Sequence, residues 1–235
     1  MDYPFETKEY KDFCTFKEIH ESRYIYGFDS SKLPFENLIE QNTMLFIQLL
    51  LRRSYCTYQA IDNAIACKNF IQLVLSVRSH FELTGSIGYL SNNLKNYFNG
   101  KTSIEKMDNL LGSLNLGFKP KTVEHPYESI NVITMIDTAD RILNEQIGSV
   151  KNILRDSYNW LSEFCHPNSL GLIFLVDKCN DRQVIFKDNV FGEKEFKILG
   201  YALISFIWFF SFYDEIYDLI RNKKNMPNII EVSCT

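Results

Sequence analysis

The chain has 235 residues, a net charge of −4 and a hydrophobic share of 46%. That share is large enough for a sizeable core, and the acidic balance argues against non-specific binding of duplex DNA, which needs concentrated Lys and Arg. Aromatic residues are abundant, with 19 Phe and 13 Tyr, whereas Gly and Pro number only 10 and 6. Few helix breakers among many large apolar residues favour long helices packed on one another.

The N-terminal residues 1–33 show no clear period, and we expect an irregular or partly helical arm. They begin with MDYPFETKEYKDF, which lacks the apolar stretch of a signal peptide. After Pro34, the segment FENLIEQNTMLFIQLLLRRS predicts the first helix, because a proline is tolerated in a first turn. Its part from Leu45 to Leu51 is apolar almost all round, which indicates a central helix.

A second long helix is predicted from about Tyr58 to Tyr97, where apolar residues recur at helical spacing. Within it, the small residues of Thr84–Gly88 are expected to let another helix cross closely, with a bend in the helix as the alternative. Thr102 and Glu105 then match a capping box, which predicts a short helix to about residue 114.

A loop is expected next, ending at Pro126. Residues 127–166 carry an apolar helical stripe, which fits either two helices or one bent helix. Two β-type runs, 172–176 and 183–186, flank the turn-forming residues 178–181 and predict a β-hairpin.

The clearest helical period runs from Phe196 to Ile220 and predicts a last helix with one face in the core. Its uncharged part, Ile198–Tyr213, has 16 residues, against the roughly 20 needed to span a membrane. A buried core helix is therefore expected, with a membrane helix as the alternative. The polar tail, residues 222–235, is expected to be loose.

These elements predict an all-α fold. We expect one domain over residues 1–235, a helical bundle of about five to seven helices with a small β-hairpin inserted before the last helix. The six cysteines form no C-x-x-C pair, and the four histidines are never three or four residues apart. No metal and no cofactor are therefore expected, and reduced thiols in the cytoplasm are the default. Short motifs of nucleotide-binding loops, hydrolases and zinc proteases are also missing from the sequence.

One polar cluster stands on an otherwise apolar helix, in the segment LVLSVRSHFELTGSIGYL. Arg78 and Glu82 are four residues apart and share a helix face, so a partly buried salt bridge is expected. Its structural interpretation is a pair that fixes packing. Its functional interpretation is a guanidinium held ready for an anion and oriented by Glu82. His80 is expected to point elsewhere, as a surface or packing residue.

A second polar cluster lies in YNWLSEFCHPNSLG. Tyr158, Ser162 and His166 are spaced by four residues and would form one polar row, with Asn168 just beyond as a further binding candidate. The structural interpretation makes His166 a C-cap residue before the hairpin. The functional interpretation makes it a general acid or base that faces Arg78 from a neighbouring helix.

The motifs RSHFELTGSIGYL and YNWLSEFCHPNSLG, followed by a hairpin and an aromatic last helix, resemble bacterial helical proteins of the HEPN superfamily (higher eukaryote and prokaryote nucleotide-binding). The resemblance covers about Tyr58 to Leu219. It implies a helical bundle, often dimeric, and in many members RNA cleavage by an Arg and a His four to six residues apart on one helix. Here ten residues separate His166 from Arg155, the nearest arginine upstream. Only His166 matches that motif, and the arginine would have to be Arg78 on another helix.

Three functions are compatible with these features. The first is a non-catalytic binding or regulatory module, or a bacterial defence component. The alternative is a metal-independent RNase of toxin or phage-defence type, with His166 as acid or base, Arg78 on the phosphate and Glu82 orienting it. The third is a membrane-associated helical protein. The partners considered are RNA or a nucleotide, a second copy of the chain, and a cognate protein.

Overall fold

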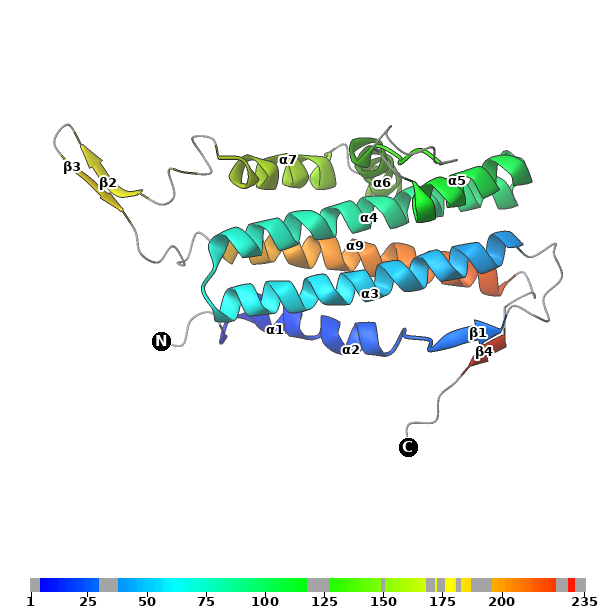
Figure 1. Cartoon of the computed structure of the whole chain (residues 1–235), viewed down its shortest axis with the longest axis horizontal. Helices are drawn as coiled ribbons and strands as arrows, with labels where there is room; N and C mark the ends of the chain where they lie inside the picture. Colours follow the sequence, from blue (N-terminus) through cyan, green and yellow to red (C-terminus); the bar gives the residue numbers. More distant parts are fainter. Residues whose placement is uncertain are drawn as a thin grey trace.

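The computed structural model describes residues 5–29, 38–117, 127–148, 151–167, 172, 176–180, 183–186, 196–222 and 228–230. The fold is an all-α bundle, as predicted (Figure 1). Its described helices are α1 (Lys8–Cys14), α2 (Phe16–Glu21), α3 (Leu38–Ala66), α4 (Phe70–Phe98), α5 (Ile104–Leu116), α6 (Val132–Ile147), α7 (Ile153–Cys165) and α9 (Phe196–Arg221). Two short antiparallel pairs of strands complete it, β1 (Gly27–Asp29) with β4 (Asn228–Ile230) and β2 (Val176–Asn180) with β3 (Gln183–Phe186).

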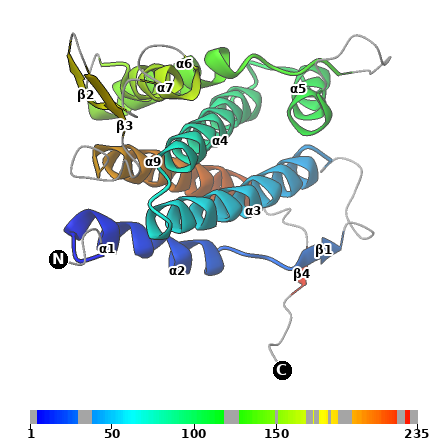
Figure 2. The same ribbon diagram turned by 60° about the vertical axis from the view of Figure 1, so that its left-hand side comes forward.

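The helix at the centre of the bundle is α4. It packs against α3, α5, α6, α7 and α9, and Figure 2 shows it between the α3–α9 side and the α6–α7 side. The helix predicted to be central from its stretch Leu45–Leu51 is α3, which packs against α2, α4, α5 and α9. The stretch is not buried all round, since Leu45 and Leu49 are 42% and 52% exposed.

The boundary between the first two long helices also differs from the prediction. α3 continues to Ala66, and α4 begins only at Phe70, rather than near Tyr58. The turn depends on Lys68, whose φ of 53° is left-handed, and on Asn69, whose side chain accepts a hydrogen bond from the backbone N–H of Gln72. With neither Gly nor Pro at this turn, apolar periodicity alone could not locate it.

Side chains also define the ends of the later helices. The N-cap of α5 is Ser103, one residue after the predicted Thr102. α6 and α7 are two separate helices, and α6 ends at Gly148, whose φ of 65° favours glycine.

The buried carboxylate of Asp140 accepts hydrogen bonds of 2.8 and 2.6 Å from the backbone N–H groups of Leu154 and Arg155. It thereby satisfies the first turn of α7 and fixes the angle between α6 and α7.

The hairpin predicted before the last helix is present and is formed by β2 and β3. β2 (Val176–Asn180) begins at the last residue of the first predicted run, 172–176, and continues into the predicted turn, 178–181. The N-terminal arm, predicted as partly helical, contains α1, α2 and β1. Within the tail predicted to be loose, Asn228–Ile230 pairs with the arm as β4. The rest of that tail, 223–227 and 231–235, lies outside the described residues.

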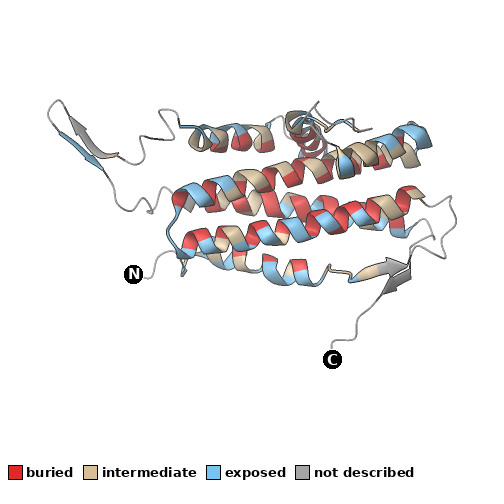
Figure 3. Cartoon of the chain, viewed as in Figure 1, coloured by how far each residue is buried: buried red, intermediate tan, exposed pale blue. Residues whose placement is uncertain are grey.

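The predicted last helix, α9, is a core helix along much of its length. Its buried side is aromatic, and Figure 3 shows the burial continuing through α3 and α4. Phe206 contacts Phe13 and Phe16 of the N-terminal arm, with ring centroids 5.7 and 5.0 Å apart. Among the described residues, Lys197–Arg221 is the one segment long and apolar enough to cross a membrane, and half of its most apolar window is buried.

The predicted close crossing at Thr84–Gly88 is the contact of α4 with α6. A Cβ added at Gly85 would lie 3.1 Å from the backbone nitrogen of Ile136. One added at Gly88 would lie 2.7 Å from the Cβ of Ala139 and 2.9 Å from the ring of Phe212. The two helices therefore approach so closely that only glycine fits at these positions.

Gly88→Ala should destabilise the protein by about 1–2 kcal/mol, because overpacking the crossing costs more than the roughly 1 kcal/mol that alanine gains in helix propensity. Gly200→Ala in α9 is the matched control, since a Cβ there meets nothing within 4 Å. That variant should gain about 0.5–1 kcal/mol. Urea unfolding measures both changes, and a stabilised Gly88→Ala variant would contradict the close crossing.

Candidate functional site

The first predicted cluster is assembled where α7 packs on α4. The Arg78 guanidinium donates three hydrogen bonds to side chains of its own chain. Its Nε lies 2.9 Å from Ser162 Oγ, one terminal nitrogen lies 3.0 Å from Glu82 Oε1, and the other lies 2.5 Å from Tyr158 Oη. The salt bridge expected from the four-residue spacing is present, and its side chains are 28% and 33% exposed.

Tyr158 holds this cluster together from the α7 side. The guanidinium carbon of Arg78 lies 4.6 Å from the centroid of its ring, a cation–π contact. Its hydroxyl accepts from Arg78 and donates to Glu82 Oε1 at 3.3 Å. Burial raises the pKa of Tyr158, against the lowering effect of Arg78. The phenol therefore keeps its proton at neutral pH and serves as a donor rather than as a base.

His166 does not join the row of Tyr158 and Ser162. α7 ends at Cys165, and His166 has the extended backbone angles φ −92° and ψ 144° of a C-cap residue. A residue before proline avoids the helical conformation, and Pro167 follows directly. His166 is exposed, and the described part of the chain gives it no hydrogen bond or ion pair. Asn168 lies outside the described residues.

A second polar cluster, which the sequence did not suggest, lies in the core between α2, α3, α4 and α9. We call it the histidine chain: His20, Ser54, His80, Ser205 and Thr84, all fully buried. Its four successive hydrogen bonds are 2.8–2.9 Å long. His80, expected as a surface or packing residue, is at its centre, with its ring stacked 3.6 Å from that of Phe206.

The chain of hydrogen bonds has one direction. His20 Nδ1 lies 2.6 Å from the carbonyl oxygen of Phe16, which can only accept, so this nitrogen carries the proton. His20 Nε2 must then accept from Ser54, and Ser54 must accept from His80 Nε2. His80 Nδ1 in turn accepts from Ser205. With both histidines neutral, every ring nitrogen of the two side chains has a hydrogen-bond partner.

Burial also disfavours charge on these rings. It lowers the pKa of His20 to about 4, with a further lowering by Arg23, and it lowers the pKa of His80 well below the usual value. A proton added to His20 Nε2, with His80 in the same tautomer, would leave two N–H groups aimed at Ser54 Oγ. Isolated polar residues in apolar helices, such as Ser205 in ISFIWFF, are the one sequence signal that could have pointed to this cluster.

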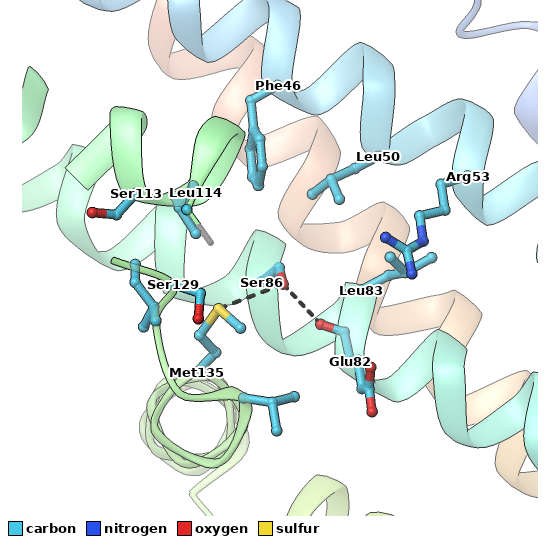
Figure 4. Close-up of a pocket in the computed structure, with 13 residues that line it drawn as sticks. Phe46, Leu50, Arg53, Glu82, Leu83, Ser86, Ser113, Leu114, Ser129 and Met135 are labelled. Atoms are coloured by element: carbon cyan, nitrogen blue, oxygen red, sulfur yellow. Dashed lines mark hydrogen bonds between the residues drawn. The ribbon is translucent and has the colours of Figure 1, made fainter. Parts of the chain in front are cut away.

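A groove opens beside Glu82, between α3, α4, α5 and α6 (Figure 4). Its volume is about 210 Å³. Phe46, Leu50, Leu114 and Met135 supply apolar walls. At the end marked by Glu82 lies Arg53, whose exposed guanidinium has no partner in the described part of the chain.

The far end of the groove carries hydroxyl groups. Ser113 and Ser129 line it, and neither side chain has a hydrogen bond among the described residues. Ser86, on the groove floor, bonds instead to the carbonyl oxygen of Glu82 and to the sulfur of Met135. The groove thus has a charged end, an apolar middle and a hydroxyl end.

No group of three or more His, Cys, Asp or Glu side chains is placed to hold a metal ion within the described ranges. Burial raises the pKa of the Cys165 thiol, which donates to the carbonyl oxygen of Leu161. Comparison of this chain with family models, with curated proteins and with solved structures gives no match.

The histidine chain predicts a fall in stability on acidification. The unfolded chain takes up a proton on His20 near pH 6.5, and the folded protein only near pH 4. Stability is therefore full above pH 6.5 and decreases towards pH 4, with a loss of about 2 kcal/mol between pH 7.5 and 5 from His20 alone. His80 acts in the same direction.

Urea unfolding at several pH values measures this dependence. His20→Gln removes one titrating ring and should flatten the curve, even where it lowers the stability at pH 7.5. An unchanged free energy of unfolding between pH 7.5 and 5 in the wild type would contradict the buried neutral histidines.

Proposed function

We propose that this protein is a non-catalytic binding module with a HEPN-like helical bundle. The observation that carries the proposal is the closed set of bonds around Arg78. Glu82, Tyr158 and Ser162 occupy all three nitrogens of its guanidinium. Cleavage of RNA without a metal needs a cation that is free for the phosphate and a base close to it. Arg78 is committed to its own chain, and Tyr158 is a donor, so this cluster favours packing over catalysis.

The binding surface in this proposal is the groove beside Glu82. Arg53 brings a positive charge to its charged end, and the carboxylate of Glu82 is already paired with Arg78, so the Arg53 guanidinium is the group that would bind an anion. The volume of 210 Å³ equals that of about seven liquid water molecules, so the ligand is small. We infer a small carboxylate with an apolar body, its acid group at Arg53 and a polar group near Ser113 and Ser129.

The catalytic alternative is tested by incubating purified wild type, Arg78→Ala and His166→Ala with structured and single-stranded RNA. We expect no cleavage by any of the three, because the Arg78 guanidinium already bonds to Glu82, Tyr158 and Ser162, and His166 makes no hydrogen bond to this cluster in the described part of the chain. Cleavage by the wild type that is lost in both variants, with circular dichroism unchanged, would replace this proposal with the RNase.

The groove is tested with 4-hydroxyphenylacetate and its uncharged amide, by calorimetry and by NMR shifts. We expect a Kd of about 4 mM for the acid, typical of about eleven heavy atoms at drug-like efficiency, and weaker binding of the amide. Arg53→Gln should weaken binding of the acid about fivefold. Arg52→Gln is the matched control, because Arg52 bonds to Gln48 and to the carbonyl oxygen of Ile25 elsewhere. Equal loss in both variants, or no binding, would contradict the anion site.

A further inference from the structure

The groove of the proposed function runs along α3, from its charged end at Arg53 to its hydroxyl end at Ser113 and Ser129 (Figure 4). Phe46 and Leu50 line its middle, and their spacing of four residues corresponds to about 6 Å along the helix axis. From Phe46 to Arg53, seven residues further, the helix advances by about 10.5 Å. A ligand that uses both ends of the groove is therefore about 10 Å long and carries its negative charge at one tip.

The last residues of an extended peptide have these dimensions. An extended chain advances by about 3.4 Å per residue, so three residues cover about 10 Å. Side chains two positions apart point to the same side and lie about 6.8 Å apart, close to the spacing of Leu50 and Phe46. With the terminal carboxylate at Arg53, the last side chain lies over Leu50, and the side chain two positions before it lies over Phe46.

The groove also has partners for peptide groups and room for two side chains. A peptide group carries one donor and one acceptor, and the hydroxyls of Ser113 and Ser129 can serve as either, since neither has a hydrogen bond among the described residues. The volume of about 210 Å³ corresponds to about seven water-sized groups. One leucine and one valine side chain together contain about as many carbon atoms, so two aliphatic side chains match the groove.

The charges favour a carboxylate at the end marked by Arg53. Its guanidinium has no partner in the described part of the chain, although the chain as a whole has a net charge of −4. Glu82, the carboxylate that lines the groove, is bonded to Arg78 at 3.0 Å. The two oxygens of a free carboxylate match the parallel donors of a guanidinium. A polypeptide terminus places this group directly beside an apolar side chain.

We propose that the groove binds the carboxyl-terminal end of a partner polypeptide that has aliphatic residues at its last position and two positions before it. The proposal rests on the anion site of the proposed function and names the molecule to which the small carboxylate belongs. The bound segment is extended: its carboxylate pairs with Arg53, and its two aliphatic side chains contact Leu50 and Phe46. The side chain between them points away from the groove, so its identity matters little.

The probe is acetyl-Ser-Gly-Val-Ser-Leu with a free carboxylate, titrated into the full chain by calorimetry and followed by NMR shifts. We expect a Kd at least tenfold below that of 4-hydroxyphenylacetate, because a second apolar side chain is buried. The terminal amide of the same peptide should bind at least fivefold more weakly. Acetyl-Ser-Gly-Ser-Val-Leu is the matched control. It has the same composition, but its valine points away from Phe46, so it should bind about tenfold more weakly.

The two arginine variants assign the binding to the groove. Arg53→Gln should weaken binding of the peptide about fivefold, whereas Arg52→Gln should leave it unchanged. 4-Hydroxyphenylacetate should displace the peptide, since both place a carboxylate at Arg53.

Equal affinity of the peptide, its amide and the control peptide would overturn the proposal. If 4-hydroxyphenylacetate binds through Arg53 but the peptide binds no more tightly, the groove is a site for a free small acid. The polypeptide partner is then wrong, and the proposed function stands. If neither ligand binds, both proposals are wrong.

Discussion

The arrangement of the bundle depends on one constraint: polar atoms buried in the core need hydrogen-bond partners. At the point where α2, α3, α4 and α9 meet, two imidazoles and three hydroxyls are fully buried. Each would be costly alone, since an unsatisfied buried donor or acceptor costs about 1–3 kcal/mol. The histidine chain satisfies them together, but only when His20, Ser54, His80 and Ser205 are in register. Apolar contacts tolerate a sliding helix, whereas this set of bonds accepts one arrangement, so it specifies how the four helices are placed.

The same rule applies to the cluster around Arg78, where α7 packs on α4. Arg78 lies on an otherwise apolar helix, and Glu82, Tyr158 and Ser162 accept a hydrogen bond from each of the three nitrogens of its guanidinium. Paired charges of this kind fix the position of α7 against α4. The cluster therefore positions the wall of the neighbouring groove, and Arg53, which has no such partners, is the cation available to a ligand.

Patterns within short stretches of the sequence predicted the features that depend on residues close together in the chain. The four-residue spacing of Arg78 and Glu82 predicted their salt bridge, and the period from Phe196 to Ile220 predicted α9. The row of Tyr158, Ser162 and His166 was extended one residue too far, although Pro167 in the sequence already disfavours a helical His166. The α3–α4 boundary was missed because Lys68 and Asn69 are not strong breakers.

The histidine chain could not be predicted from the sequence for a different reason. His80 is adjacent to Ser54 and Ser205 only after three helices have packed, and no spacing along the chain relates them. Fold class and helix faces thus follow from periodicity, whereas the partners of buried polar residues follow from tertiary structure alone.

Because the hydrogen bonds of the histidine chain all run in one direction, the short N-terminal arm influences groups as far away as α9. A single carbonyl oxygen, that of Phe16, determines which proton each ring and hydroxyl holds as far as α9. His20 and His80 are consequently opposite tautomers, Nδ1–H and Nε2–H. A variant that lacks residues 1–24 would lose both His20 and this carbonyl oxygen. The side chains of Ser54 and His80 would then have to reorient or bond to water. The N-terminal arm thus sets the direction of the hydrogen bonds in the core and is an integral part of the bundle.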